Sequence, residues 1–385
     1  MKKMWIAAAA AVLLAACGNG DKRNVVIDVP GTPATELQSF AASARDNYQI
    51  YQVNPKLFGS TGQLKAVQNR LDDIKALGTD IVYLMPIYTE GQKNAFGSPY
   101  CIQDYNGVKA SCGTLADVKA LVSAAHAKGM KVMFDWVANH TAWDHPWITA
   151  HDDWYQKDSK GNIVYPTKDG AWTDVAQLDY SSEALQDAMI AAMKYWITEA
   201  DIDGYRCDYA HGVPDSFWKK AIPRLKAVKA GFIMLAESDY ERLFDDGFDI
   251  IYDRGLKSAA RSLIAGGKAA DFVNYYKSSL DKTPSGKTKL YFVTNHDDAS
   301  EESPASTFKS KDGAFAAFSL LGSLQAAGRD GACSIYNYER VVFVAYDGGP
   351  VVGVNTGNAG LTATLPSGSG LPSTYSFGAY EVKIW

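Results

Sequence analysis

Four short apolar stretches, each with a carboxylate at or near its end, constrain the fold of this chain more than any other feature. They are residues 134–140, 204–208, 233–237 and 292–297. Apolar runs of this length between helix-like segments predict buried parallel strands. Acids at the carboxyl ends of successive strands are found where an eight-stranded β/α barrel builds its active site. The sequence therefore predicts an α/β fold, a (β/α)8 barrel, with an active site at that edge of the sheet.

From residue 48 onward, strand-like and helix-like segments alternate, which is the pattern of parallel βα units. The expected strands span residues 48–53, 81–85, 131–135, 204–208, 232–237, 248–251 and 290–295. Between the first two strands, Leu64, Val67, Leu71 and Ile74 recur at helical spacing, and Gly78 is expected to end that helix. A helix over residues 182–199 is expected to precede the fourth strand.

The same pattern gives the expected domain organisation. A catalytic barrel spans residues 46–338, a short inserted domain follows its third strand at about 141–180, and a small antiparallel β domain covers 339–385. After the helix at 311–325, too few residues remain for a complete eighth βα unit. Either residues 333–336 form a shortened eighth strand without its helix, or the barrel is incomplete. No candidate catalytic residue lies there, so we expect activity with an altered cleft edge.

The first seventeen residues have the pattern of an export signal. Lys2 and Lys3 form a positive start, the apolar stretch after them is too short to span a bilayer, and Leu-Ala-Ala-Cys closes the segment at Cys17. This resembles a bacterial lipobox, which implies a lipid on Cys17 that anchors the protein to a membrane; an ordinary cleaved signal peptide is the alternative. Because Gly18 is not an aspartate, the resemblance to sorting rules favours the outer membrane. Residues 18–45 are expected to be a tether.

Length and charge exclude some classes of protein. At 385 residues with 47 % hydrophobic content, the chain is long enough for one barrel of about 250 residues and an appended domain. A formal net charge of −5 offers no basic surface for phosphate backbones, so nucleic-acid binding is not expected. Export makes a disulfide between Cys101 and Cys112 a candidate that the sequence leaves open, whereas Cys207 is expected to be a buried strand residue.

The carboxylates suggest a reaction. Retaining hydrolysis of a glycosidic bond needs one ionised carboxylate as nucleophile and one protonated carboxyl as acid, about 5–5.5 Å apart. Asp208 follows Arg206 by two residues, so both point to one face of a strand, and the guanidinium is expected to keep the carboxylate ionised. Glu237 ends an apolar run, a setting that raises a carboxyl pKa as a general acid requires. Asp297 follows His296, a pair suited to binding sugar hydroxyls. Each acid alone is also explained as a helix N-cap, but the whole set is not.

The order of these segments resembles the α-amylase family of retaining glycoside hydrolases, family 13, from about residue 49 to 327. Further matching stretches are residues 50–54 (IYQVN), 97–105 (GSPYCIQDY) and 172–175 (WTDV). By this resemblance, Asp208 is the nucleophile, Glu237 is the acid/base and Asp297 stabilises the transition state. The chemistry so implied requires no cofactor.

The resemblance also implies roles in substrate binding. Arg206 would orient the nucleophile, while His140 and His296 would bind hydroxyls of the attacked sugar. The ring of Tyr100 would stack on that sugar. His211 stands where many members carry a lysine that contacts the next sugar, which makes it a candidate for substrate contact.

A structural calcium ion, held in many family members with an asparagine that matches Asn139, is left open. The position that usually supplies an acid is Gln177 here, and Gly212 replaces a frequent histidine. A neutral amide is a weaker ligand for a hard cation than a carboxylate. Asp135 is expected to play a structural role at the base of the site.

The sequence therefore predicts an exported lipoprotein that cleaves α-1,4-glucosidic bonds of starch-like glucans or maltooligosaccharides. An α-glucosidase, a cyclomaltodextrinase or a transglucosylase would share the catalytic set and differ in the loops, so these activities remain open. A glycan-binding lipoprotein without turnover is the alternative of a different class. The presence of all three carboxylates and both substrate histidines argues against it.

Overall fold

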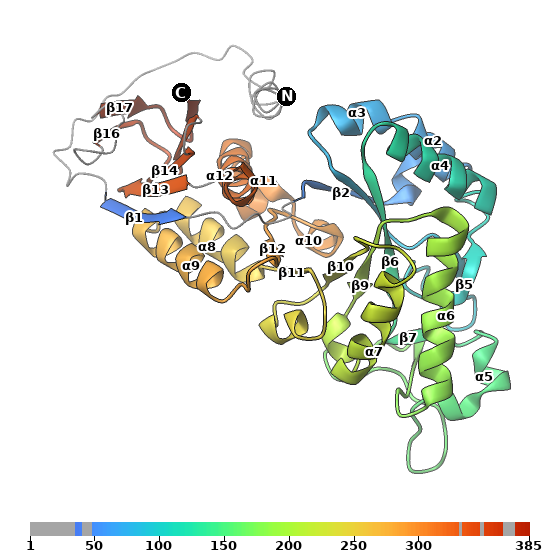
Figure 1. The fold of residues 1–385 in the computed structure, drawn as a ribbon. Coiled ribbons are helices and arrows are strands. Elements are labelled where there is room, and N and C mark those ends of the chain that lie inside the picture. The colour runs from blue at the N-terminus through green and yellow to red at the C-terminus, as the bar shows by residue number, and fades with distance from the viewer. Residues whose placement is uncertain (1–34, 41–47, 331–332, 347–349, 365–373) are drawn as a thin grey trace. The chain divides into compact units, whose positions relative to one another are not determined.

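The structure, a computed structural model, describes residues 35–40, 48–330, 333–346, 350–364 and 374–385 (Figure 1). The chain divides into two compact units, whose described parts are residues 48–251 for the first and residues 35–40 and those after 251 for the second. Residues 1–34, with the expected lipidation site Cys17, lie outside the described residues, as do residues 41–47. Within the described ranges, no helix has the length and apolar character to cross a membrane.

A parallel sheet forms the centre of the first unit. Its strands are β2 (Ile50–Val53), β3 (Ile81–Leu84), β6 (Lys131–Val137), β9 (Gly204–Asp208), β10 (Ile233–Ala236) and β11 (Ile250–Tyr252). They are neighbours in this order. Strand β12 (Thr288–Leu290) belongs to the second unit. Every residue of β3 and β10 is buried, as expected for parallel strands covered on both faces.

Helices connect these strands, and several begin and end where the sequence signals it. They are α2 (Gln63–Gln68), α3 (Leu71–Ala76), α4 (Leu115–Ala127), α6 (Glu183–Ala200) and α7 (Asp215–Lys226). Gly78 follows α3 with a φ of +83°, a conformation that glycine adopts without strain. The Ser182 side chain accepts a hydrogen bond from the Leu185 N–H and so caps α6. The single helix expected before β3 is instead divided into α2 and α3, although its four apolar residues are all buried.

Two short antiparallel sheets accompany the parallel one. Strand β4 (Tyr88–Glu90) pairs with β5 (Ile102–Val108), and β7 (His140–Ala142) pairs with β8 (Val175–Gln177). Between β7 and β8 lie the short helix α5 (Trp147–Ala150), the 3-10 turns of residues 152–154 and an irregular stretch. This stretch is the region where the sequence predicted an insertion, and we call residues 141–180 the inserted segment.

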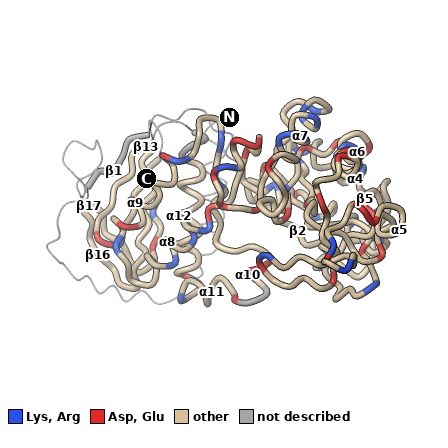
Figure 2. The backbone as a smooth tube through the Cα atoms, turned by 90° about the horizontal axis from the view of Figure 1, so that it is seen from below, with Lys and Arg blue, Asp and Glu red and all other residues tan. Residues whose placement is uncertain are grey.

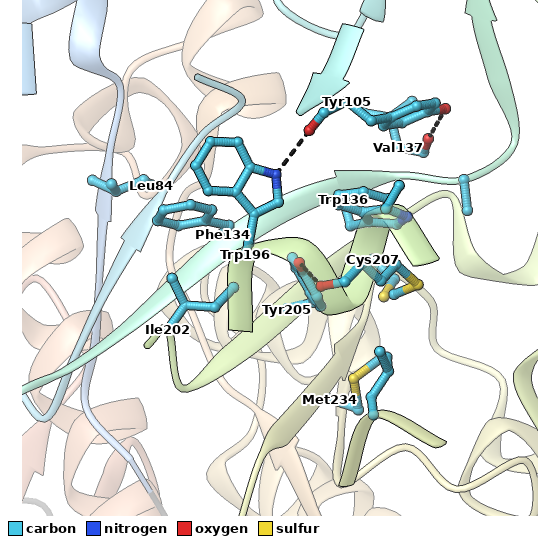
Figure 3. Close-up of a cluster of buried hydrophobic side chains, with 14 of the residues drawn as sticks. Leu84, Tyr105, Phe134, Trp136, Val137, Trp196, Ile202, Tyr205, Cys207 and Met234 are labelled. Atoms are coloured by element: carbon cyan, nitrogen blue, oxygen red, sulfur yellow. Dashed lines mark hydrogen bonds between the residues drawn. The ribbon is translucent and has the colours of Figure 1, made fainter. Parts of the chain in front are cut away.

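The core of the first unit is rich in aromatic rings (Figure 3). Trp136 stacks on Tyr105 with ring centroids 5.0 Å apart, and Trp196 donates a hydrogen bond from Nε1 to the Tyr105 carbonyl at 2.8 Å. The Tyr105 hydroxyl in turn donates to the Val137 carbonyl at 2.7 Å. Large rings bury much apolar surface, and the hydrogen bonds of Trp196 and Tyr105 join α6, β5 and β6 at the level of the site.

The second unit combines helices with antiparallel strands. Its helices are α8 (Arg254–Ile264), α9 (Ala269–Asp281), α10 (His296–Glu301), α11 (Pro304–Thr307) and α12 (Lys311–Asp330). A five-stranded sheet has the order β1 (Thr35–Phe40), β13 (Cys333–Tyr338), β14 (Val341–Tyr346), β15 (Val351–Asn355) and β18 (Val382–Ile384). Strands β16 (Leu361–Thr364) and β17 (Thr374–Phe377) form a separate pair. Residues of α8, α9 and α12 share a hydrophobic cluster with this sheet.

Three expectations about the second unit need correction. Residues 333–336 are not a shortened eighth barrel strand, because they belong to β13, which pairs antiparallel with β14. Only two residues, Glu339 and Arg340, connect these strands, and so short a loop makes a hairpin and not a crossover. Thr35–Phe40, expected within the tether, form β1 and pair with β13. Strand β12 ends at Leu290, so residues 291–295 are irregular and not the seventh strand.

The candidate disulfide is also absent from the structure. Cys101 and Cys112 are both buried free thiols. Cys101 lies beside the Asp174 carbonyl, with its Sγ 3.4 Å from that oxygen, whereas the Sγ of Cys112 lies 3.2 Å from Gln63 Oε1. Cys207 is buried as expected. Basic and acidic residues are interspersed along both units (Figure 2), in line with the small net charge.

Candidate active site

Three neighbouring strands bring the candidate residues of the first unit to one edge of its sheet. Asp135 of β6 and Leu235 of β10 lie opposite Arg206 of β9, one on each side. Asp208 ends β9 and shares a face with Arg206, because alternate residues of a strand point the same way. Glu237 directly follows β10. The carboxyl ends of β6, β9 and β10 therefore carry four charged side chains next to one another.

Arg206 is the centre of this group, because its guanidinium contacts three carboxylates. Its Nη1 lies 2.8 Å from Asp135 Oδ1 and 2.9 Å from Asp208 Oδ1, and its Nη2 lies 3.0 Å from Glu237 Oε2. The side chains of Arg206 and Asp135 are fully buried, whereas Asp208 keeps 14 % and Glu237 15 % of its side chain exposed. One buried cation thus holds an inner carboxylate and two carboxylates that solvent reaches.

The electrostatics of this group differ from the expectation. Burial raises the pKa of the Asp208 carboxyl well above its usual range, the neighbouring Glu237 raises it further, and Arg206 opposes both. We expected Arg206 to keep Asp208 ionised, but one guanidinium does not compensate three carboxylates in a buried setting. Two acids this close titrate as a pair. The pair therefore retains a proton at pH values where an isolated aspartic acid is ionised.

Asp135 is held by hydroxyl groups as well as by Arg206. Tyr83 donates from its hydroxyl to Asp135 Oδ2 at 2.5 Å, and Tyr100 donates to the same oxygen at 2.9 Å. The Tyr88 hydroxyl donates to the Asp135 carbonyl at 2.8 Å. Asp135 therefore holds the Arg206 guanidinium from its buried side, the structural role expected from the sequence. The ring of Tyr100 lies 5.9 Å from the Arg206 Cζ atom, so Tyr100 also borders the charged group.

His140 is buried beside the site. Burial lowers its pKa to about 4, against a raising effect of a hydrogen bond with the Tyr100 backbone. Its imidazole is therefore neutral at pH 7, a state in which one ring nitrogen donates and the other accepts. Its ring packs edge-on against Trp172 with centroids 5.7 Å apart.

Asn139 does not have the surroundings of a calcium ligand. Its Oδ1 accepts a hydrogen bond from Gln177 Nε2 at 3.2 Å, and the same Nε2 lies 2.9 Å from the Asn139 carbonyl. Calcium prefers six to eight oxygens with several carboxylates among them. The described part of the chain contains no cluster of three or more His, Cys, Asp or Glu residues arranged to hold a metal. The side chains present therefore do not fit a calcium ion at Asn139.

His211, three residues after Asp208, lies in a second group of side chains. Its Nε2 is 3.4 Å from Asp169 Oδ2, and its ring packs edge-on against those of Tyr209 and Tyr240. The Tyr209 hydroxyl also donates to Asp169 Oδ2. The inserted segment, which carries Asp169, thus contacts the residues that follow the carboxyl end of β9.

His296 and Asp297 belong to the second unit. They begin α10, where the Asn295 side chain accepts from the Asp298 N–H and forms the helix cap. His296 Nε2 lies 3.2 Å from Asp297 Oδ1, and 60 % of the Asp297 side chain is exposed. The cap is Asn295 and not Asp297, so the helix-capping alternative does not account for Asp297.

The structure adds residues that the sequence did not single out. Tyr83 and Tyr88 hold Asp135 from β3 and β4, and Tyr209 and Asp169 contact the site from a turn and a loop. In the sequence, Tyr83 is only one residue of the apolar run expected to form the second strand. Asp169 lies in an irregular exposed stretch, where no periodicity indicates a contact.

One cavity lies away from the charged group. It has a volume of about 680 Å³ and lies between β5, the start of the inserted segment and α6. Tyr105, His145, Trp147, Tyr195 and Glu199 are among its lining residues. None of the candidate carboxylates lines it, so it is separate from the site described above.

Known proteins resemble this chain in sequence. Residues 37–226 match the model of the alpha-amylase catalytic domain. Alpha-amylase MalA of Haloarcula japonica is 28 % identical over 294 residues, which are 72 % of this chain and 43 % of that protein. The oligo-1,6-glucosidase of Heyndrickxia coagulans is 27 % identical over 194 residues, 41 % of this chain and 34 % of that protein. The chain spans about half or less of the length of these curated relatives.

Solved structures resemble it over most of its length. An alpha-amylase from Lactobacillus plantarum matches with a TM-score of 0.75 at 25 % sequence identity, over 88 % of this chain and 99 % of that one. This similarity, together with the parallel sheet and the C-terminal antiparallel sheets, confirms the barrel-type α/β fold expected from the sequence.

Proposed function

We propose that this chain, for which the catalytic-domain match and the relatives support the alpha-amylase family, hydrolyses α-1,4-glucosidic bonds with retention at the anomeric carbon. The observation that carries the proposal is the contact of one buried guanidinium with two partly exposed carboxylates, Asp208 and Glu237. Retaining hydrolysis needs two such groups, one ionised and one protonated. A pair that retains one proton supplies both states.

The assignment of roles rests on the resemblance of the motifs. Arg206 contacts both Asp208 and Glu237, and the position of each acid in its motif assigns Asp208 as the nucleophile and Glu237 as the acid. An Asp208 oxygen bonds to the anomeric carbon while Glu237 gives its proton to the leaving oxygen. Glu237 then takes a proton from water, whose oxygen displaces Asp208 and restores both carboxyl groups.

The remaining candidates act on the substrate in this proposal. Asp297 stabilises the positive charge that develops on the sugar ring, and His296 binds a hydroxyl beside it. Neutral His140 binds a second hydroxyl of the attacked sugar, and the Tyr100 ring stacks on that sugar. These assignments rest on the resemblance of the surrounding sequence motifs.

The substrate class is proposed as starch-like glucan or maltooligosaccharide. The name of the Haloarcula japonica relative, an alpha-amylase, supports this choice. The name of the Heyndrickxia coagulans relative, an oligo-1,6-glucosidase, supports a glucosidase as the second candidate. Both share the proposed chemistry and differ in the length and linkage of the glucan they accept.

We also propose that the protein is an outer-membrane lipoprotein anchored through Cys17. The support is the lipobox-like sequence that ends at Cys17 and the glycine that follows it. Growth of an expressing strain with labelled palmitate, followed by separation of inner and outer membranes, tests this. Label in the outer-membrane fraction that disappears with Cys17→Ala is expected, and label-free protein would contradict the proposal.

The test of the activity is reducing-sugar release from soluble starch, maltoheptaose and cyclodextrin by residues 18–385 and by its Asp208→Asn variant. Loss of a covalent nucleophile is expected to lower kcat by on the order of 10⁴-fold or more. The Asp153→Asn variant, which changes an exposed carboxylate of the inserted segment, is the matched control. Product lengths separate an amylase from a glucosidase. A folded wild-type protein that binds maltooligosaccharide without turnover would leave the glycan-binding alternative.

A further inference from the structure

Tyr209, the residue after Asp208, has an unusual backbone conformation. Its φ and ψ are both +44°, in the left-handed region that side chains other than glycine rarely adopt. In this conformation its backbone N–H donates to Glu237 Oε2 at 2.8 Å. The proposed acid is thus bonded to a peptide group whose geometry the local chain alone does not favour. Something must hold Tyr209 in place.

Contacts of the Tyr209 side chain supply that restraint. Its hydroxyl donates to Asp169 Oδ2, and its ring meets the edge of Trp172 with centroids 4.8 Å apart. Burial and Asp169 raise the pKa of the Tyr209 hydroxyl, and the same hydrogen bond lowers the pKa of the Asp169 carboxyl. Both directions agree with a neutral phenol that donates to a carboxylate. Asp169 and Trp172 both come from the inserted segment.

Gly212 makes this position of the ring compatible with the turn. A Cβ at residue 212 would lie 2.0 Å from Tyr209 Cε1 and 2.2 Å from Cδ1, which is far inside any real contact. The absence of a side chain at 212 therefore leaves the space that the ring fills. Tyr209 is therefore enclosed from two stretches of the chain, by Asp169 and Trp172 of the inserted segment and by Gly212 of its own turn.

We propose that Asp169 is a positioning residue for Glu237, acting through Tyr209. The inserted segment holds the Tyr209 ring through Asp169 and Trp172, the held ring fixes the left-handed turn, and the turn directs the Tyr209 N–H at the Glu237 carboxyl. The inference rests on the proposed function, in which Glu237 is the general acid. In this inference, the inserted segment positions the carboxyl group that gives its proton to the leaving group.

The dependence on the leaving group tests this inference. In the full chain, Tyr209→Phe removes the hydroxyl that donates to Asp169, and Asp169→Asn replaces the charged acceptor by a neutral, weaker one; both variants keep the side-chain volumes. The specificity constant kcat/KM is measured for maltoheptaose, whose leaving group needs a proton, and for 2,4-dinitrophenyl α-maltoside, whose leaving group does not. A misplaced acid affects only the first substrate. We expect a loss of about tenfold or more with maltoheptaose and less than about threefold with the activated substrate.

Matched controls come from the same segment. Asp153→Asn and Tyr165→Phe change an exposed carboxylate and an exposed tyrosine of the inserted segment, and both are expected to leave the two constants unchanged. Equal losses on both substrates, or no loss on either, would overturn the positioning role while the hydrolase activity stands. A wild-type chain that cleaves neither substrate would overturn the proposed function itself.

A further variant displaces the Tyr209 ring without changing Asp169 or Tyr209. Gly212→Ala places a methyl group where the ring lies, and we expect the same substrate-dependent loss as for Asp169→Asn. In a Tyr209→Gly background, which adopts the left-handed turn without strain, Gly212→Ala is expected to add less than a further twofold loss. An equal effect of Gly212→Ala in both backgrounds would show that it acts elsewhere, against the inference.

Discussion

At the scale of single residues, the arrangement around Arg206 serves chemistry at the expense of stability. Three carboxylates surround one buried guanidinium, and burial together with Glu237 raises the pKa of Asp208. An acid whose pKa is higher in the folded than in the unfolded protein stabilises the fold at low pH. That contribution is lost as the pH rises through the folded-state value. At neutral pH, the ionised form of Asp208 therefore lowers the stability of the folded protein.

This sign gives a stability prediction. Asp208→Asn removes the charge and is expected to raise the free energy of unfolding at pH 7, because the folded state no longer has to hold this buried carboxylate ionised beside Glu237. Near pH 3, where Asp208 is protonated in both states, the variant and the wild type should be equally stable. Urea unfolding at the two pH values measures the difference. A variant less stable than wild type at pH 7 would contradict this account of the site.

Asp135→Asn provides the contrasting case. Asp135 is fully buried and accepts from Arg206, Tyr83 and Tyr100, so its charge is compensated. Loss of these charge-assisted bonds is expected to lower the free energy of unfolding by about 2 kcal/mol at pH 7. Two substitutions of the same kind, two residue positions apart across the β6–β9 ladder, should thus act in opposite directions. Parallel urea titrations of both variants are the measurement.

Buried histidines add a pH dependence of their own. Burial lowers the pKa values of His140 and His145 to about 4, below the value of about 6.5 in an unfolded chain. The unfolded state then binds more protons, so stability falls as the pH drops from about 6.5 towards 4, by up to about 1.4 kcal/mol per pH unit for each histidine. His145→Gln is expected to reduce this slope in urea unfolding monitored by tryptophan fluorescence. Exposed His151→Gln, as the control, should leave the slope unchanged.

Residue-scale prediction from sequence worked where spacing fixes geometry. Arg206 and Asp208, two apart in a strand, point the same way. Asp135 lies two residues before the end of the neighbouring strand β6, and Glu237 directly follows β10. The sequence did not predict the role of Tyr209. Its N–H points at Glu237 because the chain makes a left-handed turn there, and that turn depends on contacts with a loop 40 residues earlier. The pKa of Asp208 was also misjudged, since burial of three acids together is a property of the folded site.

At the scale of elements, the pairing of β7 with β8 brings the two ends of the inserted segment together. His140 pairs with Gln177 in this ladder, and the Gln177 amide bonds to both the carbonyl and the side chain of Asn139. An amide pair here does what a bound cation does in a site rich in carboxylates: it ties one loop to another. Apolar runs in the sequence predicted most of the parallel strands. The short strands β7 and β8 have too few residues to show a recognisable pattern.

The amide pair leads to a prediction about calcium. Millimolar EDTA is expected to leave the Tm of the wild-type protein unchanged within about 1 °C, because the side chains at Asn139 do not fit the ion. Gln177→Glu supplies a carboxylate next to Asn139, and the Tm of this variant is expected to rise when calcium is added. Exposed Gln156→Glu controls for the added charge. A wild-type Tm that falls with EDTA and recovers with calcium would refute this.

At the scale of the molecule, the second unit draws on both ends of the chain. Strand β1, from residues 35–40, forms the edge of a sheet whose other strands follow residue 332. The sequence correctly placed an antiparallel β domain after the barrel, because hairpin turns and alternation are local signals. It placed the start of that domain too late and missed β1, because the pairing of segments nearly 300 residues apart leaves no local pattern.

Truncation tests the contribution of β1. A chain that starts at Thr35 keeps the strand, whereas a chain that starts at Tyr48 leaves β13 as an unprotected edge. We expect the shorter chain to have the lower Tm and to aggregate faster on warming, since exposed edges pair with other chains. Calorimetry and light scattering on the two proteins compare them directly. Identical melting and scattering would mean that β1 contributes nothing to the sheet.

The space that Gly212 leaves for Tyr209 makes these two positions interdependent. A side chain at 212 collides with the tyrosine ring, so the residues at 209 and 212 are not independent in any redesign of this turn. A larger residue at 212 requires a smaller one at 209, and the two positions are best randomised together rather than one at a time.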